Sequence, residues 1–399
     1  MNSVFNSITQ IFAVMGFSLR TIPQRMGASA AAVLGIAGVV AVLVGILSIA
    51  QGFQHAMTAS GSPQTVIVMR KGSDGEMMSG LTREDVNRIA QKPGLLRSAE
   101  GPAASAELFV VINLPKRSTG TDANVPLRGV GTAAFAVRPE VQMLSGRRFE
   151  TGKNEMIVGR AAAREFQGLE LNGSIRVGPA DWKIVGIFAD EGGISESEIW
   201  TDASILQAAY RRGESFQSIY ARLESADKLD TFKDALTSDP QLQVDVQRQT
   251  EYYSRQSQTT AGLVRGFGTV ISILMGVGAL FGALNTMYNA VATRTREIAT
   301  LRALGFQATP IVISVMAESL ALSLAGGMLG GLGAYLAFNG YEAATLNYQT
   351  FSQVAFAFAV TPVLVMEGVL YAAAIGFWGG LFPALRAARL PIASALREQ

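Results

Sequence analysis

The sequence predicts an α-helical membrane protein with four transmembrane helices and one α+β extracytoplasmic domain, inserted between the first and second helices. Only 16% of the 399 residues are charged and 49% are hydrophobic, whereas ordinary soluble domains carry roughly 25% charged residues. The charges crowd between Arg70 and Arg265, and four other stretches are almost free of them. We therefore expect a bundle of membrane helices and a water-soluble insert of about two hundred residues.

Each of the four weakly charged stretches is long enough to cross a hydrocarbon layer of about 30 Å at about 1.5 Å per helical residue. The predicted spans are residues 27–50, 266–293, 309–335 and 362–385. Between and around them we expect an interfacial N-terminal segment, the extracytoplasmic domain, a stalk helix, a short charged helix, an outer loop and a C-terminal tail. These segments are 1–26, 51–250, 251–265, 294–306, 336–361 and 386–399.

The insert alternates strand-like and helix-like segments. Residues 64–70 (QTVIVMR) are apolar and β-branched, as in a strand, and residues 82–91 begin with a Thr-x-x-Asp capping pattern typical of a helix. A strand, helix and strand are expected again just before the second span, with a β-rich stretch in between. The segments concerned are 218–223, 226–236 and 242–246, and, in the β-rich stretch, 155–159 and 182–188. We predict two β-α-β elements that flank a β-rich module.

The arginines of the short segments all fall on one side of the predicted spans. They are Arg20, Arg25, Arg294, Arg296, Arg302, Arg386, Arg389 and Arg397. The short connection 336–361 contains neither Lys nor Arg. Because basic loops stay in the cytoplasm, we expect both termini inside and the insert outside. The first span starts too late and its apolar core is too long for a cleaved signal peptide.

Composition excludes several classes of function. Cysteine is absent and His55 is the only histidine, so there is no thiol nucleophile, no Ser-His-Asp triad and no H-E-x-x-H metal site. No G-x-x-x-x-G-K-[ST] motif occurs, so we expect no ATP site of the P-loop type and no cofactor bound by this chain. A net charge of +2 without a basic patch argues against nucleic-acid binding.

The stretch after the second predicted span is the most informative part of the chain. The charges Arg294, Arg296, Glu297 and Arg302 are interleaved there with the apolar Ile298, Leu301 and Leu304. This pattern predicts a short helix with a charged edge and an apolar edge, of the kind that docks into a groove on a partner. The alternative is a solvated loop whose arginines only orient the spans.

Small and polar residues inside the spans suggest further roles. Glycines four residues apart let helix backbones approach closely, either within one chain or between two copies. They are Gly278, Gly282, Gly326, Gly330, Gly376 and Gly380. Asn285 and Glu318 fall within predicted spans, and Glu367 lies near an outer end. An intramembrane carboxylate raises the hypothesis of an ion pathway, but we see no second deep charge and expect Glu318 to be structural.

These residues resemble the MacB- and FtsX-like ABC transporter permeases. The resemblance to the end of that family's second span rests on Asn285, Met287, Val291, Arg294, Glu297, Ile298, Arg302, Ala303 and Gly305. The tail at residues 379–390, the first-span residues 34–36 with Gly52, and the stretches 128–130, 146–149, 154–155 and 182–188 are also similar. Ala299 and Phe306 depart from the usual pattern, with effects expected on fine packing.

The resemblance implies a non-enzymatic permease subunit of a bacterial inner-membrane transporter that works as a homodimer or a related heterodimer. An ABC ATPase on a separate subunit would bind ATP and Mg²⁺, and a periplasmic adaptor is a further candidate partner. The ATPase would contact the coupling segment through Arg294, Arg296, Glu297, Ile298, Leu301, Arg302 and Gly305. ATP hydrolysis would then drive mechanotransmission to the outer domain for export or extraction of an amphipathic substrate such as a lipoprotein, peptide or antibiotic.

Two other functions stay open at this point. One is an ion-coupled secondary transporter built on Glu318, which would need no ATPase and gives no reason for a large outer domain. The other is an FtsX-like regulator of cell-wall hydrolases without transport, although FtsX proteins usually have smaller outer domains. A membrane-anchored enzyme is disfavoured because no nucleophile–base pair or metal-ligand set is apparent.

Overall fold

The computed structural model describes residues 16, 26–59, 61–99, 101–347 and 350–391. The chain forms two compact units. Of the described residues, the helical unit comprises residue 16 and those within 26–51, 263–341 and 358–391, and the inserted domain comprises those within 52–262 and 342–357. Arg20, Arg25 and Arg397, together with most of the predicted N-terminal segment and the end of the C-terminal tail, lie outside the described residues.

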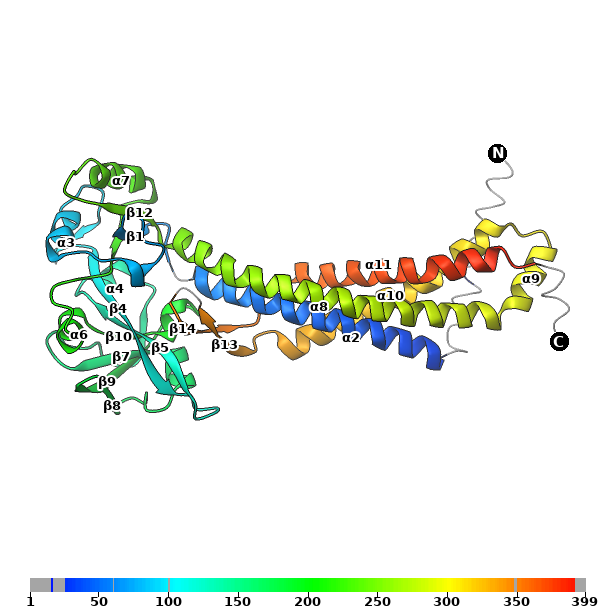
Figure 1. Ribbon diagram of the computed structural model, residues 1–399, viewed down its shortest axis with the longest axis horizontal. Helices are drawn as coiled ribbons and strands as arrows, with labels where there is room; N and C mark the ends of the chain where they lie inside the picture. Colours follow the sequence, from blue (N-terminus) through cyan, green and yellow to red (C-terminus); the bar gives the residue numbers. More distant parts are fainter. Residues whose placement is uncertain (1–15, 17–25, 60, 100, 348–349, 392–399) are drawn as a thin grey trace. The chain divides into compact units, whose positions relative to one another are not determined.

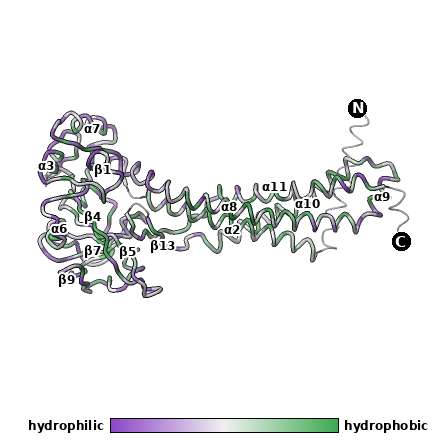
Figure 2. Tube along the Cα trace, viewed as in Figure 1, coloured by the Kyte–Doolittle hydropathy of each residue, from purple (hydrophilic) through white to green (hydrophobic). Residues whose placement is uncertain are grey.

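In the part of the chain that the structure describes, four helices are long and apolar enough to cross a membrane, as the sequence predicted. They are α2 (Met26–Ala59), α8 (Gln249–Thr293), α10 (Ala308–Phe338) and α11 (Pro362–Ala388). The short helix α9 (Thr295–Ala303) follows α8. Figure 1 shows the four long helices running side by side, and Figure 2 shows that apolar residues follow their length. The start of α11 is well defined, because Thr361 accepts a hydrogen bond from the Leu364 N–H and proline occupies the first turn.

Glycines bring three of these helices into close contact. A Cβ on Gly326 would lie 2.8 Å from the Val33 carbonyl oxygen on α2, and a Cβ on Gly380 would lie 2.7 Å from Ser319 on α10. Gly330 and Gly376 are equally crowded, so none of the four accepts a side chain without movement of a helix. The Ser319 hydroxyl also donates to the Gly376 carbonyl at 2.7 Å, which joins α10 to α11.

Gly278 and Gly282 do not pack within the helical unit. Among the described residues, no atom of another element would come within 4 Å of a Cβ at either position. Both glycines lie on an exposed face of α8 together with Asn285, Phe267 and Phe281. The six glycines predicted to pack helices therefore fall into two groups, because four build the bundle of one chain and two leave a smooth surface on its outside.

The inserted domain is built around a ten-stranded sheet in the order β12-β1-β11-β4-β5-β10-β7-β9-β6, with β8 paired to β9. The strands are β1 (Thr65–Arg70), β4 (Ala104–Pro115), β5 (Asp122–Val130), β6 (Gln142–Gly146), β7 (Glu155–Gly159), β8 (Ser174–Val177), β9 (Ala180–Ala189), β10 (Ile199–Asp202), β11 (Ser218–Arg222) and β12 (Val244–Arg248). A short pair, β2 (Arg97–Ser98) and β3 (Gly101–Pro102), stands apart. Most pairings are antiparallel, whereas β10–β5 and β7–β9 are parallel.

Short helices cover this sheet. They are α3 (Arg83–Ala90), α4 (Ala134–Val137), α5 (Arg160–Glu165), α6 (Ala203–Ala209) and α7 (Leu229–Thr237), with 3₁₀ turns η2 (Glu76–Met78), η3 (Ile194–Ser197) and η4 (Ala226–Lys228). The capping pattern expected at Thr82 is present, because its side chain accepts from the Asp85 N–H and the Asp85 carboxylate accepts from the Thr82 N–H. The predicted flanking β-α-β elements meet where β1 lies between β11 and β12.

The connection between α10 and α11 contains a β-hairpin that the sequence did not reveal. We expected an outer loop at 336–361, but β13 (Glu342–Asn347) and β14 (Ser352–Ala357) pair antiparallel over their whole length. Alternation along residues 352–356 buries Ser352, Val354 and Phe356. This hairpin belongs to the inserted domain, although it is far from the rest of that domain in sequence.

A charged cluster lies at the centre of the inserted domain. The Arg128 guanidinium donates to Glu76 at 2.8 Å, to Glu107 at 3.0 Å and to Glu198 at 2.8 Å, and all four side chains are at most 4% exposed. Arg138 donates to the other oxygen of Glu107 at 2.7 Å. Burial alone would raise the pKa of Glu76, but the charge and hydrogen bonds of Arg128 outweigh burial and hold this pKa below its ordinary value.

The motif residues of the β-rich module have structural roles. Gly146 has a φ of +75°, and a Cβ there would collide with the Val185 carbonyl. Arg147 binds Glu155 through two hydrogen bonds of 2.6 and 2.7 Å. These hydrogen bonds lower the pKa of Glu155 to about 2. The resemblance in this region therefore reflects how the domain is folded.

Candidate functional site at helix α9

Helix α9 is set off from α8 and α10 by two local breaks. At Arg294 the backbone leaves the helical conformation, with φ −109° and ψ 10°. After Leu304 the chain turns at Gly305, whose φ of +96° is strained for any other residue. The Phe306 N–H then donates to the Leu301 carbonyl at 3.1 Å and closes the C-terminal turn. Gly305, predicted as a coupling residue, therefore ends the helix.

One side of α9 is buried in the helical unit. Ile298 is 7% exposed and packs in a cluster with Met287 and Val291 of α8 and Ile311 and Val315 of α10. Ala299 is also buried. The prediction that Ile298 contributes to an edge available to a partner is therefore wrong, because its side chain stabilises the end of the bundle.

Arg294, the residue just before α9, is also largely buried. The Arg294 guanidinium lies 3.1 Å from a Glu297 oxygen and 3.4 Å from a Glu318 oxygen, and the Arg294 side chain is 13% exposed. This contradicts the expectation that Glu318 has no charged partner. Arg294 is the single residue between the end of α8 at Thr293 and the start of α9 at Thr295, and from there its guanidinium reaches the Glu318 carboxylate on α10 although the two residues are distant in sequence. Arg294 and Glu318 therefore join α9 to α10.

Arg302 fixes the other end of α9. Its guanidinium donates to the Ala388 carbonyl in the last turn of α11 at 2.5 Å. A cation at this place also complements the negative end of the helix dipole of α11. Helix α9 is thus tied to α10 through Arg294 and to α11 through Arg302.

The remaining side of α9 is open. Arg296 and Thr300 are exposed, Glu297 is half-exposed, and Leu304 is 74% exposed. Leu301 is half-buried beside them. An exposed leucine next to charged side chains on a short, well-anchored helix is typical of a surface that inserts into a partner's groove. Figure 1 shows α9 at one end of the bundle, beside the ends of α8, α10 and α11.

Glu318 also borders a cavity of about 310 Å³ between α2, α8 and α10. Polar groups at its wall include Ser29, Thr286, Asn289 and Thr293. The Glu318 side chain is only 4% exposed and lies against Arg294. Its negative charge is thus balanced inside the bundle, which supports a structural role.

We expect Glu318→Leu to destabilise the purified chain by about 1–3 kcal/mol, because it leaves the Arg294 guanidinium without one of its carboxylates. The double variant Glu318→Leu/Arg294→Leu should recover much of this loss, since replacing both partners removes the unpaired charge. Thermal unfolding in detergent measures both effects, with Glu367→Leu on the exposed side of α11 as the control. Normal assembly of Glu318→Gln with a pH-dependent loss of activity would instead favour an ion-coupled transporter.

Among the residues that the structure describes, no group of three or more His, Cys, Asp or Glu side chains is placed to hold a metal ion.

Two protein-family models match this chain. The model of the MacB-like periplasmic core domain matches residues 29–239, and that of the FtsX-like permease C-terminal domain matches residues 269–392. The first of these covers more than half of the chain. The second includes α9 and the helices to which α9 is tied.

Several ABC transporter proteins are similar in sequence to most of this chain. A macrolide export ATP-binding/permease protein MacB from Chlorobium luteolum is 27% identical over 92% of this chain and 57% of its own length. The chain therefore spans a little over half of such relatives. The ABC transporter permease YknZ of Bacillus subtilis is 24% identical over the whole length of both chains. A crystal structure of the extracellular domain of a YknZ transporter from Gram-positive bacteria aligns with 46% of this chain and 100% of its own, at 17% identity and a TM-score of 0.36.

Proposed function

Because this chain belongs to the MacB- and FtsX-like family of ABC transporter permeases, we propose that it is the membrane subunit of a transporter driven by an ATPase on a separate subunit. The observation that carries this proposal is the open side of α9, where Arg296, Thr300 and Leu304 are exposed on a helix anchored to α10 and α11. The sequence contains no P-loop motif, so ATP and Mg²⁺ would be bound by the partner.

Purification tests this proposal directly. The tagged chain, solubilised from its native membrane in mild detergent, is expected to bring down an ABC ATPase in about equal amount, and the complex should hydrolyse ATP. Recovery of the pure chain without any ATPase, at several detergent strengths and with ATP present, would contradict the proposal.

The work of the complex would be mechanotransmission to the extracytoplasmic domain, for export or extraction of an amphipathic lipoprotein, peptide or antibiotic. The names of the macrolide exporters among its relatives support an export role.

We propose that α9 and both termini lie in the cytoplasm and the inserted domain outside. The one-sided distribution of arginines supports this orientation. Because the chain has no cysteine, a single cysteine reports its own position without further changes. In intact cells with the outer membrane permeabilised, a membrane-impermeant maleimide should label Asp181→Cys and leave Thr300→Cys unlabelled until the inner membrane is broken. Labelling of position 300 from outside would reverse the assignment.

We further propose that two copies pair through the open face of α8. Gly278 and Gly282 leave room there for a second helix, and the exposed Asn285 would find a hydrogen-bond partner across the interface instead of facing lipid. Gly278→Cys should therefore form a disulfide between copies in membranes under mild oxidation. Met328→Cys on the exposed side of α10 is the matched control and should stay monomeric. Equal cross-linking at both positions would argue against α8 as the interface.

A further inference from the structure

The hairpin between the third and fourth membrane helices is continuous with both of them. Helix α10 ends at Phe338 and β13 begins at Glu342, while β14 ends at Ala357 and α11 begins at Pro362. Within the short connections, the Gly340 N–H donates to the Phe358 carbonyl and the Phe358 N–H to the Tyr341 carbonyl, both at 2.9 Å. The pairing of the two chain segments thus continues beyond the strands almost to the helix ends.

Strand β14 is anchored on the extracytoplasmic domain by hydrogen bonds. The Ala355 N–H donates to the Ser197 hydroxyl oxygen at 2.9 Å, and the Asn124 side-chain amide donates to the Phe351 carbonyl at 2.6 Å. Phe351 has a φ of +51°, which is unfavourable for an aromatic residue and persists only where surrounding contacts hold the backbone. The Asn124 contact is one of these.

Burial strengthens the same attachment. Val354 is 1% exposed, and Phe356 is 5% exposed with its ring edge-on to Phe53 at 5.7 Å between centroids. At the tip of the hairpin the Asn347 amide donates to Gln256 at 3.2 Å, and both side chains are buried. Because Gln256 lies on α8, the hairpin also touches the first turns of the helix that continues into the second span.

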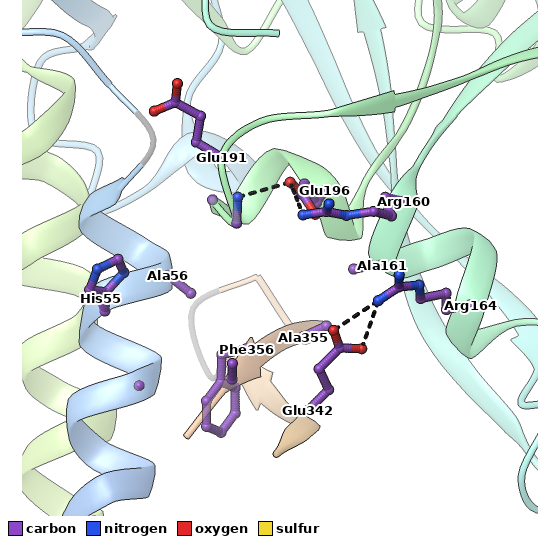
Figure 3. Close-up of a pocket in the computed structure, with 14 residues that line it drawn as sticks. His55, Ala56, Arg160, Ala161, Arg164, Glu191, Glu196, Glu342, Ala355 and Phe356 are labelled. Carbon is purple, nitrogen blue, oxygen red and sulfur yellow. Dashed lines mark hydrogen bonds and ion pairs between the residues drawn. The ribbon is translucent and has the colours of Figure 1, made fainter. Parts of the chain in front are cut away.

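The beginning of β13 is held much less firmly. Figure 3 shows Glu342 reaching Arg164 of α5 beside a cavity of about 240 Å³, whose wall also includes Ala56, Ala161 and Ala355. The ion pair is 2.8 Å long, but its side chains are 60% and 65% exposed. Exposed pairs of this kind contribute little to stability. The hairpin is therefore attached through β14 and its tip.

We propose that the β13–β14 hairpin is a second mechanical link, which carries movement of the third and fourth membrane helices to the extracytoplasmic domain in parallel with α8. This inference rests on the proposed function, because it concerns how the work of the ATPase reaches the outer domain. Helix α9 is tied to α10 and α11 by Arg294 and Arg302. A push on α9 would therefore move the two helices that end in the hairpin, and the Ser197 and Asn124 contacts would pass this movement on.

The first experiment loosens the attachment. Asn124→Ala/Ser197→Ala removes both hydrogen bonds, which should shift the hairpin towards its detached form by roughly tenfold or more. The matched control Gln167→Ala/Ser105→Ala removes an amide donating to the Lys116 carbonyl and a hydroxyl accepting from the Gly131 N–H, both away from the hairpin. Hydrogen exchange of residues 352–357 in the full chain should accelerate in the first variant only. Unchanged exchange in that variant would overturn the attachment.

The second experiment measures transmission in the complex with its ATPase. A spin label at Asp181→Cys on each copy reports the distance between the outer domains before and after trapping with ATP and vanadate. We expect Asn124→Ala/Ser197→Ala to reduce the trapping-dependent change in label distance by half or more. Its rate of ATP hydrolysis should stay within about twofold of that of the chain without these substitutions. The control variant should keep the full change in distance. A full change in the loosened variant would overturn the proposal. If the complex without the Asn124→Ala and Ser197→Ala substitutions shows no change in the label distance on trapping, the result would count against the proposed function instead.

A cross-link supplies the converse test. Ser197→Cys/Ala355→Cys should form a disulfide, because the hydrogen bond places these two residues next to each other. If the hairpin acts while attached, the oxidised form keeps the trapping-dependent distance change. Loss of that change on oxidation, with recovery on reduction, would mean that the hairpin must detach during the cycle and would overturn the proposal.

Discussion

Replacing Arg128 with methionine should unfold the extracytoplasmic domain. The change leaves Glu76, Glu107 and Glu198 buried next to one another, with only Arg138 nearby to balance Glu107. Breaking a buried ion pair by removing one partner typically costs about 3–5 kcal/mol, and here one guanidinium serves three carboxylates. A whole domain is stable by only about 5–15 kcal/mol, so this single loss approaches the total.

Tryptophan fluorescence of the full chain in detergent measures this effect, because Trp182 and Trp200 are fully buried in the same domain. Arg117→Met is the matched control, since Arg117 donates to Glu170 at 2.6 Å on the surface of the domain. That variant should change the free energy of unfolding by less than about 1 kcal/mol. Similar unfolding curves for both variants would show that the cluster is not essential. Arg128→Lys should fall between them, because an ammonium cannot reproduce the forked contacts.

The buried cluster around Arg128 also makes the stability of the domain depend on pH. The pKa of Glu76 is held below its ordinary value in the folded domain, so the folded state binds this proton less readily than the unfolded chain does. The contribution of Glu76 to stability is therefore present at neutral pH and lost as pH falls through the acidic range.

The parts of the fold that the sequence predicted depend on local patterns. The four spans are long and uncharged, and the helix at Thr82 carries its own cap. The buried cluster depends instead on five charged residues from distant segments, each of which reads as a solvated side chain when taken alone. One signal was present: Arg128 interrupts the otherwise uncharged C-terminal part of β5, NVPLRGV, and an arginine in that place needs buried partners.

The candidate site shows a second limit of the sequence. Helical spacing shows that Ile298, Leu301 and Leu304 lie towards one side of α9, but it does not show which of them faces the bundle. The structure buries Ile298 and exposes Leu304. The Arg294–Glu318 contact was missed because it joins two helices, and no pattern within either helix announces it.

If α9 docks on an ATPase as we propose, replacing Leu304 with aspartate should separate the two subunits. Leu304 is 74% exposed, so the change should cost the chain itself no more than about 0.5 kcal/mol. In the proposed complex with an ATPase, the same change would remove an apolar side chain from the partner's groove and would put an unpaired charge there. Losses of about 2–5 kcal/mol are typical of such interfaces, which corresponds to roughly a thirtyfold weaker association or more.

Leu304→Asp is a cleaner test than Glu297→Lys, because Glu297 already binds Arg294 at 3.1 Å and its reversal would also disturb the end of α8. The measurement is the amount of ATPase that co-purifies with the tagged chain, together with ATP hydrolysis by the eluted complex. Leu144→Asp on β6 is the control, since that leucine is 54% exposed in the extracytoplasmic domain and should leave ATPase binding unchanged. Copies of the Leu304→Asp chain should still pair and remain folded. Full ATPase recovery and activity in that variant would show that α9 does not form the interface with the ATPase.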